Sequence, residues 1–338
     1  MRSRCSLTTA ALALPLITAA LALPLALTLV TRAGAQGEPY PRRAIRIVVP
    51  LPPGGSPDYL ARLLAERLQA TLGQPLVVEN RPGAGGNIAR EHVARQPPDG
   101  YTLVMSEAGH VLSAAMVGKL AFDPIKDFEA ITLAAKIPFV LAVNPSLPAT
   151  TIKDFIGLAK ARPGALTYGS AGIGSPHHFA AELLKSLSAI DIVHVPYKGS
   201  AGIIPAMLAS EIDFTIGAIN SLLPHFRAGK LRPIALAATT RTPVMPELPT
   251  IAEAADLPQY GVDIWLGVLA PAGTPRTIVE RLNLEINRVM RDPATIRDRL
   301  LPQGLDPVGS TPEQFADTMR TDLATYTRVA REAGMKAQ

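Results

Sequence analysis

Residues 47–68 read IVVPLPPGGSPDYLARLLAERL, and the rest of the chain can be understood outward from this stretch. Three apolar β-branched residues open it, and such a run is typical of a buried strand. Prolines and a Gly-Gly pair then interrupt the pattern, and four leucines recur at helical spacing from Leu60 to Leu68. The stretch therefore predicts a strand, a glycine-rich loop and the start of a helix.

The start of this helix is a candidate seat for an anion. We expect Ser56 to be its N-cap, with Pro57 at the first helical position and Asp58 in the first turn. A helix N-terminus presents unpaired N–H groups and roughly half a positive charge, which suits a carboxylate. Gly54 and Gly55 lack side chains, so a ligand could approach the backbone there. An ordinary turn that binds nothing is the alternative interpretation of the same residues.

The first 35 residues read as a segment separate from the folded protein. Arg2 and Arg4 give a positive start, residues 7–30 are apolar and uncharged, and Ala33-Gly34-Ala35 fits a cleavage site. This pattern predicts an export signal that is cut after Ala35. The apolar run is longer than a usual signal core, so an uncleaved membrane anchor is the alternative.

Composition narrows the class of protein. The chain has 338 residues, enough for two domains, and is 48% hydrophobic but only 5% aromatic, so its core is mostly aliphatic. Loss of the signal lowers the 33 basic residues to 30 against 28 acidic ones, a net charge of +2, which gives no case for nucleic-acid binding. The single cysteine, Cys5, leaves with the signal, so no disulfide or thiolate metal site is expected. An exported chain without cysteine fits the bacterial periplasm.

Strand and helix signals alternate along the whole chain. The β-α-β-α-β order of its first third predicts a parallel sheet covered by helices, with ligands beyond the carboxyl ends of the strands. Gly73 should end the first helix, Thr151 should cap another, and Thr274 should cap a third that starts at Pro275. Expected strands are residues 45–49, 76–78, 101–105, 139–143, 166–168, 192–195, 214–216, 234–238 and 265–270, and expected helices are 58–72, 87–95, 151–161, 177 onward, 275–290 and 312–338.

A second loop, GSAGIGSP at 169–176, repeats the physical features of the first. It has glycines, a serine that could cap a helix, and a proline at the expected helix start. Two α/β units would thus each place a glycine-serine loop at a helix N-terminus. Two lobes that face each other across a cleft would bring these loops together.

Three motifs for catalysis or cofactor binding are incomplete. A nucleophile elbow needs glycine two residues before its serine, but tyrosine precedes Ser170 and isoleucine precedes Ser175 at that position. The GAGG run at 83–86 lacks the third glycine of a dinucleotide fingerprint. His177 and His178 are adjacent rather than spaced as metal ligands, and we expect them to support the loop or the helix start. The sequence therefore predicts no catalysis, no cofactor and no metal site.

Eight motifs together resemble the solute-binding proteins of tripartite tricarboxylate transporters, the Bug-type receptors. They cover essentially the whole chain after the signal, and they are specific as an ordered set although each is weak alone. The motifs are VVPLPPGGSPD (48–58), LGQPLVVENRPGAGGNIA (72–89), PPDGYTL (97–103), YGSAGIGSPHH (168–178), HVPYKG (194–199), AGKLRPIAL (228–236), LPTIAEA (248–254) and APAGTP (270–275).

The resemblance implies a two-lobed α/β periplasmic binding protein of type II, the Venus flytrap architecture. We expect lobe one to comprise residues 37–138 plus 257–338, and lobe two residues 139–256. The family captures small organic anions, such as di-, tri- or aromatic carboxylates, and delivers them to membrane permease subunits. We expect a monomer with no nucleic-acid partner. A sensor that feeds a signalling partner and a secreted hydrolase are the alternatives.

The resemblance also assigns binding residues, because the family holds a ligand carboxylate with the first-strand loop and the SAG-type loop. Loop order adds four positions, at which selectivity would lie. Lobe one supplies Pro53, Gly54, Gly55, Ser56 and Asp58; lobe two supplies Ser170, Ala171, Gly172, Gly174, Ser175 and His178; and the selectivity positions are Ser106, Glu107, Tyr197 and Asn220.

The chain departs from the family pattern at three positions, and one of them is Gly202, where the family usually has proline. Gly217 stands where the family often has aspartate, and Leu51 stands where it often has phenylalanine. An acidic side chain at position 217 could have bound an ammonium or a hydroxyl group of a ligand. Its absence argues against an amino-acid ligand. Tyr197-Lys198-Gly199 is either a polar contact to the ligand or an exposed turn.

Overall fold

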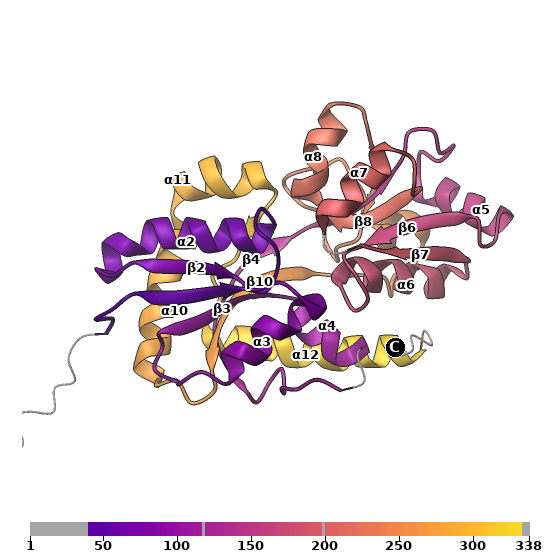
Figure 1. Cartoon of the computed structure of the whole chain (residues 1–338). Helices are drawn as coiled ribbons and strands as arrows, with labels where there is room; N and C mark the ends of the chain where they lie inside the picture. Colours follow the sequence, from indigo (N-terminus) through magenta and orange to yellow (C-terminus); the bar gives the residue numbers. More distant parts are fainter. Residues whose placement is uncertain (1–39, 117–118, 198–199, 333–338) are drawn as a thin grey trace, which may run out of the picture. The chain divides into compact units, whose positions relative to one another are not determined.

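The computed structural model describes residues 40–116, 119–197 and 200–332. The expected export signal, residues 1–35, and Lys198-Gly199 lie outside this part of the chain, so their interpretations stay predictions. No helix within the described ranges is both long enough and apolar enough to span a bilayer. From residue 41 onward the chain forms two α/β lobes, each built around its own sheet (Figure 1).

The first sheet has six strands in the described part of the chain. They are β1 (Ile45–Val49), β2 (Leu76–Asn80), β3 (Thr102–Glu107), β4 (Phe128–Ile137), β10 (Ile264–Pro271) and β11 (Asp306–Pro307), in the spatial order β11-β4-β10-β3-β1-β2. β1 is parallel to β2 and β3, which confirms the parallel arrangement expected for the first three strands. β10 is antiparallel to β3 and β4, so the whole sheet is mixed.

The second sheet has five strands in the same described ranges. They are β5 (Phe139–Val143), β6 (Leu166–Ser170), β7 (Ile192–Pro196), β8 (Phe214–Ala218) and β9 (Arg232–Leu236), in the spatial order β7-β6-β8-β5-β9. β6 is parallel to β7 and β8, whereas β5 is antiparallel to β8 and β9. All five were expected from the sequence, with bounds that shift by up to two residues.

Helices cover the sheets. α2 and α10 pack together beside the first sheet. α12 packs on α4 and β4, which confirms that the expected C-terminal helix packs back on lobe one. In Figure 1, α2 and α12 lie on opposite sides of the first sheet, and α6 and α7 lie on opposite sides of the second. The helices are α2 (Ser56–Leu72), α3 (Asn87–Ala94), α4 (Gly109–Met116), α5 (Ile152–Ala161), α6 (Pro176–Ser188), α7 (Ile203–Leu208), α8 (Ile219–Arg227), α9 (Ile251–Ala255), α10 (Arg276–Arg291), α11 (Pro293–Thr295) and α12 (Pro312–Glu332), with short turns η1 (Ala84–Gly86), η2 (Ser200–Gly202), η3 (Ile296–Leu300) and η4 (Leu301–Gln303).

Two of the expected helix caps are wrong. α2 begins at Ser56 with Gly55 as its N-cap and no side-chain cap, so the predicted Ser56 cap does not form. Asp58 holds the loop instead, because its Oδ2 accepts the Gly54 N–H over 3.0 Å. At α10 the N-cap is Pro275, and the preceding threonine hydroxyl donates to a backbone carbonyl of its own turn.

Three other expected helix boundaries are confirmed, whereas the expected end of the last helix, at residue 338, lies outside the described residues. Gly73 ends α2 in a left-handed conformation with φ of 69°, which glycine adopts without strain. Thr151 caps α5 in a reciprocal capping box with Asp154. Ser175 caps α6 by accepting the backbone N–H of His178. These local rules worked where the cap was satisfied within its own turn.

Within the described ranges, the chain crosses between the sheets twice, at Pro138 and again within residues 237–263. The two crossings are tied together, because Lys136 Nζ lies 2.9 Å from Asp263 Oδ2, and Asp263 Oδ1 accepts the Thr239 N–H over 3.1 Å. The expected lobe boundaries, 138/139 and 256/257, fall at these crossings. The division into lobes at those residues stays a prediction.

Candidate functional site

A cavity of about 260 Å³ lies between the facing edges of the two sheets. It is slightly smaller than the range of roughly 300–1,000 Å³ that is usual for drug-sized ligands, so it suits a small metabolite. Its walls come from loops and strand ends of both lobes. The described residues that line it are Leu51, Pro52, Pro53, Gly54, Gly55, Ser56, Pro57, Gly85, Glu107, Ile137, Phe139, Ala171, Ser175, Pro176, His177, Ala201, Ile204, Ala218, Ser221 and Ile264.

Strand order explains why these distant residues meet. In lobe one, Ile137 ends β4, Ile264 begins the antiparallel β10 and pairs with it, and Glu107 ends β3. The loops after β1 and β2 complete the same edge of the sheet. In lobe two, Phe139 begins β5 and pairs with Ala218 at the end of β8. The cavity therefore lies at the carboxyl ends of the parallel strands, as expected for an α/β fold.

Three helix N-termini converge on the cavity. Ser56 belongs to the first turn of α2, Ser175 is the N-cap of α6, and Ser221 lies in the first turn of α8. Each N-terminus carries about half a positive charge and unpaired N–H groups, so their combined field favours an anion. None of the described lining residues is a lysine or arginine. The positive potential at the described wall thus comes from the backbone.

Asp58 holds the first loop in place from behind the cavity wall. Its carboxylate accepts bonds from Gly54 N, Arg62 and Asn80, each over 3.0 Å. Burial alone would raise the pKa of Asp58, but the hydrogen bonds from Arg62, Gly54 and Asn80 together hold it below its usual value. Asp58 therefore positions the glycine loop and does not line the cavity.

Ser170 and His178 hold the second loop in the same way. Ser170 Oγ lies 2.6 Å from His194 Nε2 and accepts the Gly172 N–H over 3.1 Å. The His178 ring stacks on His194 with centroids 4.3 Å apart, and its Nδ1 accepts the Gly174 N–H over 3.4 Å. Burial lowers the pKa of both His178 and His194 to about 4, so both rings are neutral at physiological pH.

The structure separates the expected site residues into two groups. The first group lines the cavity, and the second lies behind its wall and supports it. Pro53, Gly54, Gly55, Ser56, Glu107, Ala171 and Ser175 line the cavity, whereas Asp58, Ser106, Ser170, Gly172, Gly174, His178, Tyr197 and Asn220 do not.

Asn220 joins the two lobes at the edge of the cavity. Its Nδ2 donates to Ser56 Oγ over 2.7 Å, from the first turn of α8 to the first residue of α2. Its Oδ1 is buried and has no hydrogen-bond partner among the described residues. This bond is a direct polar link between the helix N-termini of the two lobes.

Sequence reasoning missed most of the apolar wall. Ile137, Phe139 and Ile264 have the pattern of ordinary buried strand residues, and only the strand pairing places them at the cavity. His177 was expected to support the loop, but it lines the cavity, and burial lowers its pKa to about 4. A Cβ at the neighbouring Gly217 would lie 3.4 Å from His177 Cδ2, an ordinary van der Waals contact, so Gly217 borders this ring.

One buried ion pair lies against the cavity. Arg90 is fully buried, and its Nη2 donates to Glu107 Oε1 over 2.7 Å. Glu107 Oε2 accepts the Gly109 N–H over 2.6 Å, and Arg90 Nη1 also donates to Gly85 O over 2.9 Å. Burial lowers the pKa of Arg90, and Glu107 opposes that change. Glu107 is the one carboxylate among the described lining residues.

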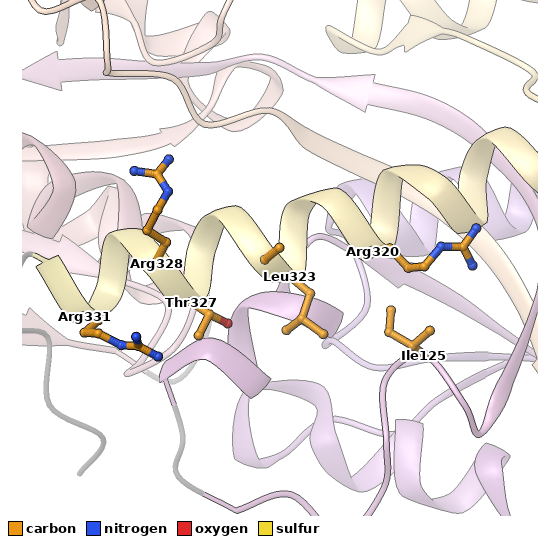
Figure 2. A pocket seen from close by; sticks show the side chains of 7 residues that line it. Ile125, Arg320, Leu323, Thr327, Arg328 and Arg331 are labelled. Carbon is orange, nitrogen blue, oxygen red and sulfur yellow. The ribbon is translucent and has the colours of Figure 1, made fainter.

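A second hollow, on α12, differs in kind from the cavity. It is an open surface hollow of about 530 Å³, and Figure 2 shows Leu323 pointing toward Ile125 across it, with arginines spread along the helix. Two of these arginines form ion pairs within α12, Arg320 with Asp317 and Arg328 with Glu332. The described residues contain no cluster of side chains suited to a metal ion.

Two α/β lobes joined by two crossings, with a cavity suited to an anion between them, define the class of periplasmic-type solute-binding proteins. Residues 60–335 match the family described as the tripartite tricarboxylate transporter family receptor. This chain therefore belongs to that receptor family, as its motifs predicted. Members of the family are solute-binding receptors and not enzymes, which confirms the expectation of no catalysis.

Relatives with printed names agree with this assignment. Protein BugT of Bordetella pertussis is 34% identical over 306 residues, which span 90% of this chain and 93% of BugT. Rpa4515 of R. palustris, solved with adipate, is 37% identical, with a TM-score of 0.82 over 88% of this chain and 99% of that one. MatC (Rpa3494) from Rhodopseudomonas palustris, solved with bound malate, is 33% identical, with a TM-score of 0.79 over 86% of this chain and 99% of that one.

Proposed function

We propose that this protein is a periplasmic receptor that captures a small organic carboxylate and delivers it to a tripartite tricarboxylate-type membrane permease. The observation that carries the proposal is the convergence of three helix N-termini, those of α2, α6 and α8, on one small cavity. The adipate bound to Rpa4515 and the malate bound to MatC support a carboxylate as the ligand class.

Backbone groups do most of the binding in this proposal. One ligand carboxylate accepts hydrogen bonds from the backbone N–H groups of Gly55 and Ala171, whereas the Gly54 N–H is already bound to Asp58. The helix dipoles stabilise the charge of the carboxylate. The apolar wall takes the carbon skeleton. Such a receptor would need roughly micromolar affinity, about −8 kcal/mol, which a few charge-assisted hydrogen bonds and a small apolar contact can supply.

Closure of the lobes completes the site. The crossings at Pro138 and residues 237–263 act as the hinge, and the Ser56–Asn220 bond joins the lobes once they meet. The permease would then bind the closed, loaded form. Export by the segment before Gln36 and action as a monomer complete the proposal.

A thermal-shift panel tests the proposal. The protein purified from the periplasm is heated with mono-, di-, tri- and aromatic carboxylates, amino acids and sugars. A ligand at one hundred times its dissociation constant adds about 2.7 kcal/mol, which for a protein of this size raises the midpoint by a few degrees. We expect a carboxylate to produce this shift, and Ser56→Ala to reduce it.

The matched control is Ser146→Ala, which changes an exposed serine outside the cavity lining and should leave the shift intact. A clear shift with a sugar and none with any acid would overturn the carboxylate assignment, while the two-lobed fold would stand.

A further inference from the structure

We propose that Glu107 is a selectivity residue whose carboxylate binds an uncharged hydrogen-bond donor of the ligand. The preferred ligand would then be a hydroxy acid, with its carboxylate at the helix N-termini and its hydroxyl at Glu107. This inference rests on the proposed function, because it assigns the second end of the same cavity. It also separates this chain from a receptor that simply takes a diacid.

Glu107 faces the cavity with unused acceptor capacity. Its two oxygens each accept one bond in the described structure, from Arg90 Nη2 over 2.7 Å and from Gly109 N over 2.6 Å. A carboxylate offers about four lone-pair sites, so about two stay available. The residue is 5% exposed, and it lines the cavity. A ligand group that meets it must donate a hydrogen bond, because an ionised carboxylate only accepts.

The charge of Glu107 is already balanced. Arg90 is fully buried and pairs with it directly, so a ligand cation is not needed to neutralise the site. An ammonium group would leave a net positive charge there, and a second ligand carboxylate would face an acceptor of its own charge. A hydroxyl group meets neither penalty. This balance favours a neutral donor over both charged alternatives.

The position of Glu107 sets where the hydroxyl lies. Glu107 ends β3, which stands between β1, followed by α2, and β10, which begins with the apolar Ile264. Neighbouring strands lie about 4.8 Å apart, so a donor at Glu107 lies roughly 5–10 Å from a carboxylate at the start of α2. This separation corresponds to a short acid with its hydroxyl near the far end of the chain.

A purely structural role for the pair is the competing explanation. Glu107 bonds the first N–H of α4, and Arg90 bonds Gly85 O and Asn87 Oδ1, so the pair could serve only to fix these turns. However, a buried ion pair is often no more stabilising than apolar side chains of similar volume, which makes stability a weak reason for this arrangement. The two explanations differ in one respect: only the selectivity role predicts discrimination between ligands.

Isothermal titration of matched ligand sets tests the inference. Each set keeps one chain length and one carboxylate and changes only the far end, as in butanoate, 4-hydroxybutanoate, 4-aminobutanoate and succinate, with the corresponding five- and six-carbon sets. In the best-fitting set we expect the hydroxy acid to bind at least about tenfold more tightly than the other three, since a bond to a charged acceptor is worth that much. Glu107→Gln should shrink this preference to under about threefold.

The matched control is Glu79→Gln, which changes a glutamate on β2, separated from β3 by β1; Glu79 pairs with Arg81 and lies outside the cavity lining. The Glu79→Gln variant should bind the ligands in the same order of affinity as the wild-type protein. If Glu107→Gln does not fold, the order of ligand affinities of the wild-type protein tests the inference by itself. A diacid, amino acid or unsubstituted acid that binds as tightly as the hydroxy acid overturns the inference and leaves the proposed receptor function standing. Absence of binding by every acid refutes both.

Discussion

Asn220→Ala should weaken ligand binding by removing the bond that joins the lobes at the cavity. Asn220 Nδ2 donates to Ser56 Oγ over 2.7 Å, and a neutral bond of this kind is worth about 1 kcal/mol net. The substitution also removes the buried Oδ1 atom, which has no hydrogen-bond partner in the described ranges, so part of that energy is regained. We therefore expect Kd to rise about threefold.

The bond contributes only to the closed form, because both groups reach water when the lobes separate. Isothermal titration with the best carboxylate should show the weaker binding, and urea unfolding of the ligand-free protein should change little. Asn144→Ala is the control: Asn144 Nδ2 bonds Met207 O and Ser210 Oγ within lobe two. That control should lower the free energy of unfolding and leave Kd unchanged.

A double-mutant cycle with Ser56→Ala separates the interlobe bond from other effects. If Asn220 acts through Ser56, the double variant should bind no more weakly than Ser56→Ala alone, and the coupling energy should equal the whole effect of Asn220→Ala, about 0.7 kcal/mol. Strictly additive effects on Kd, or an unchanged Kd for Asn220→Ala, would refute the role of the Ser56–Asn220 bond in ligand binding.

Three further predictions concern stability. Burial raises the pKa of Asp322 to about 6, so Asp322→Asn should stabilise the protein by up to about 3 kcal/mol near neutral pH. This gain should vanish below about pH 4, where the carboxyl group is protonated in both the folded and the unfolded state. Urea unfolding at both pH values measures the gain, and an equal gain at both would contradict the prediction. Burial lowers the pKa of His178 and His194 from the ordinary value near 6.5 to about 4. Between about pH 6.5 and pH 4 these histidines therefore take up protons on unfolding, and the free energy of unfolding should fall as the pH drops through this range. The His178→Gln/His194→Gln variant should show a flatter pH profile of the unfolding midpoint, and an unchanged slope would count against the assignment. Gly267→Ala should lower the free energy of unfolding by about 1–3 kcal/mol, because a Cβ there would lie 2.1 Å from an aromatic carbon of Phe315. Gly157→Ala, at an open position within α5, should raise it by about 0.5–1 kcal/mol. Thermal melts should show opposite shifts of the midpoint for these two variants.

Local sequence signals were sufficient for much of the fold. The run at 47–49, the Gly73 stop and the Thr151 cap depend on interactions within one turn or one strand, and the structure has them as expected. The two glycine-serine loops were also located correctly, because glycine, serine and proline at a helix start form a short-range pattern. Seven of the fifteen expected site residues line the cavity, and six of these seven belong to the two loops.

The rest of the site depends on distant partners. Ser56 does not cap α2, because Asp58 holds the loop and Asn220 of the other lobe bonds the serine hydroxyl. β4 has no strong alternation of polar and apolar residues, because its middle is buried on both faces, with α10 and α12 packed against it. Glu107 and Arg90 are seventeen residues apart, and only the folded chain shows that they pair against the cavity. Topology, which no local pattern contains, decides these features.

The central claim is that backbone N–H groups and helix dipoles hold a ligand carboxylate in the cavity between the lobes. The most direct test is a pair of isothermal titrations, one with the best-binding acid and one with its primary amide, which has nearly the same shape and no charge. We expect the amide to bind at least about 30-fold more weakly, since the charge at helix N-termini is worth about 2 kcal/mol in a partly buried site. Equal affinity of the acid and the amide would contradict the claim.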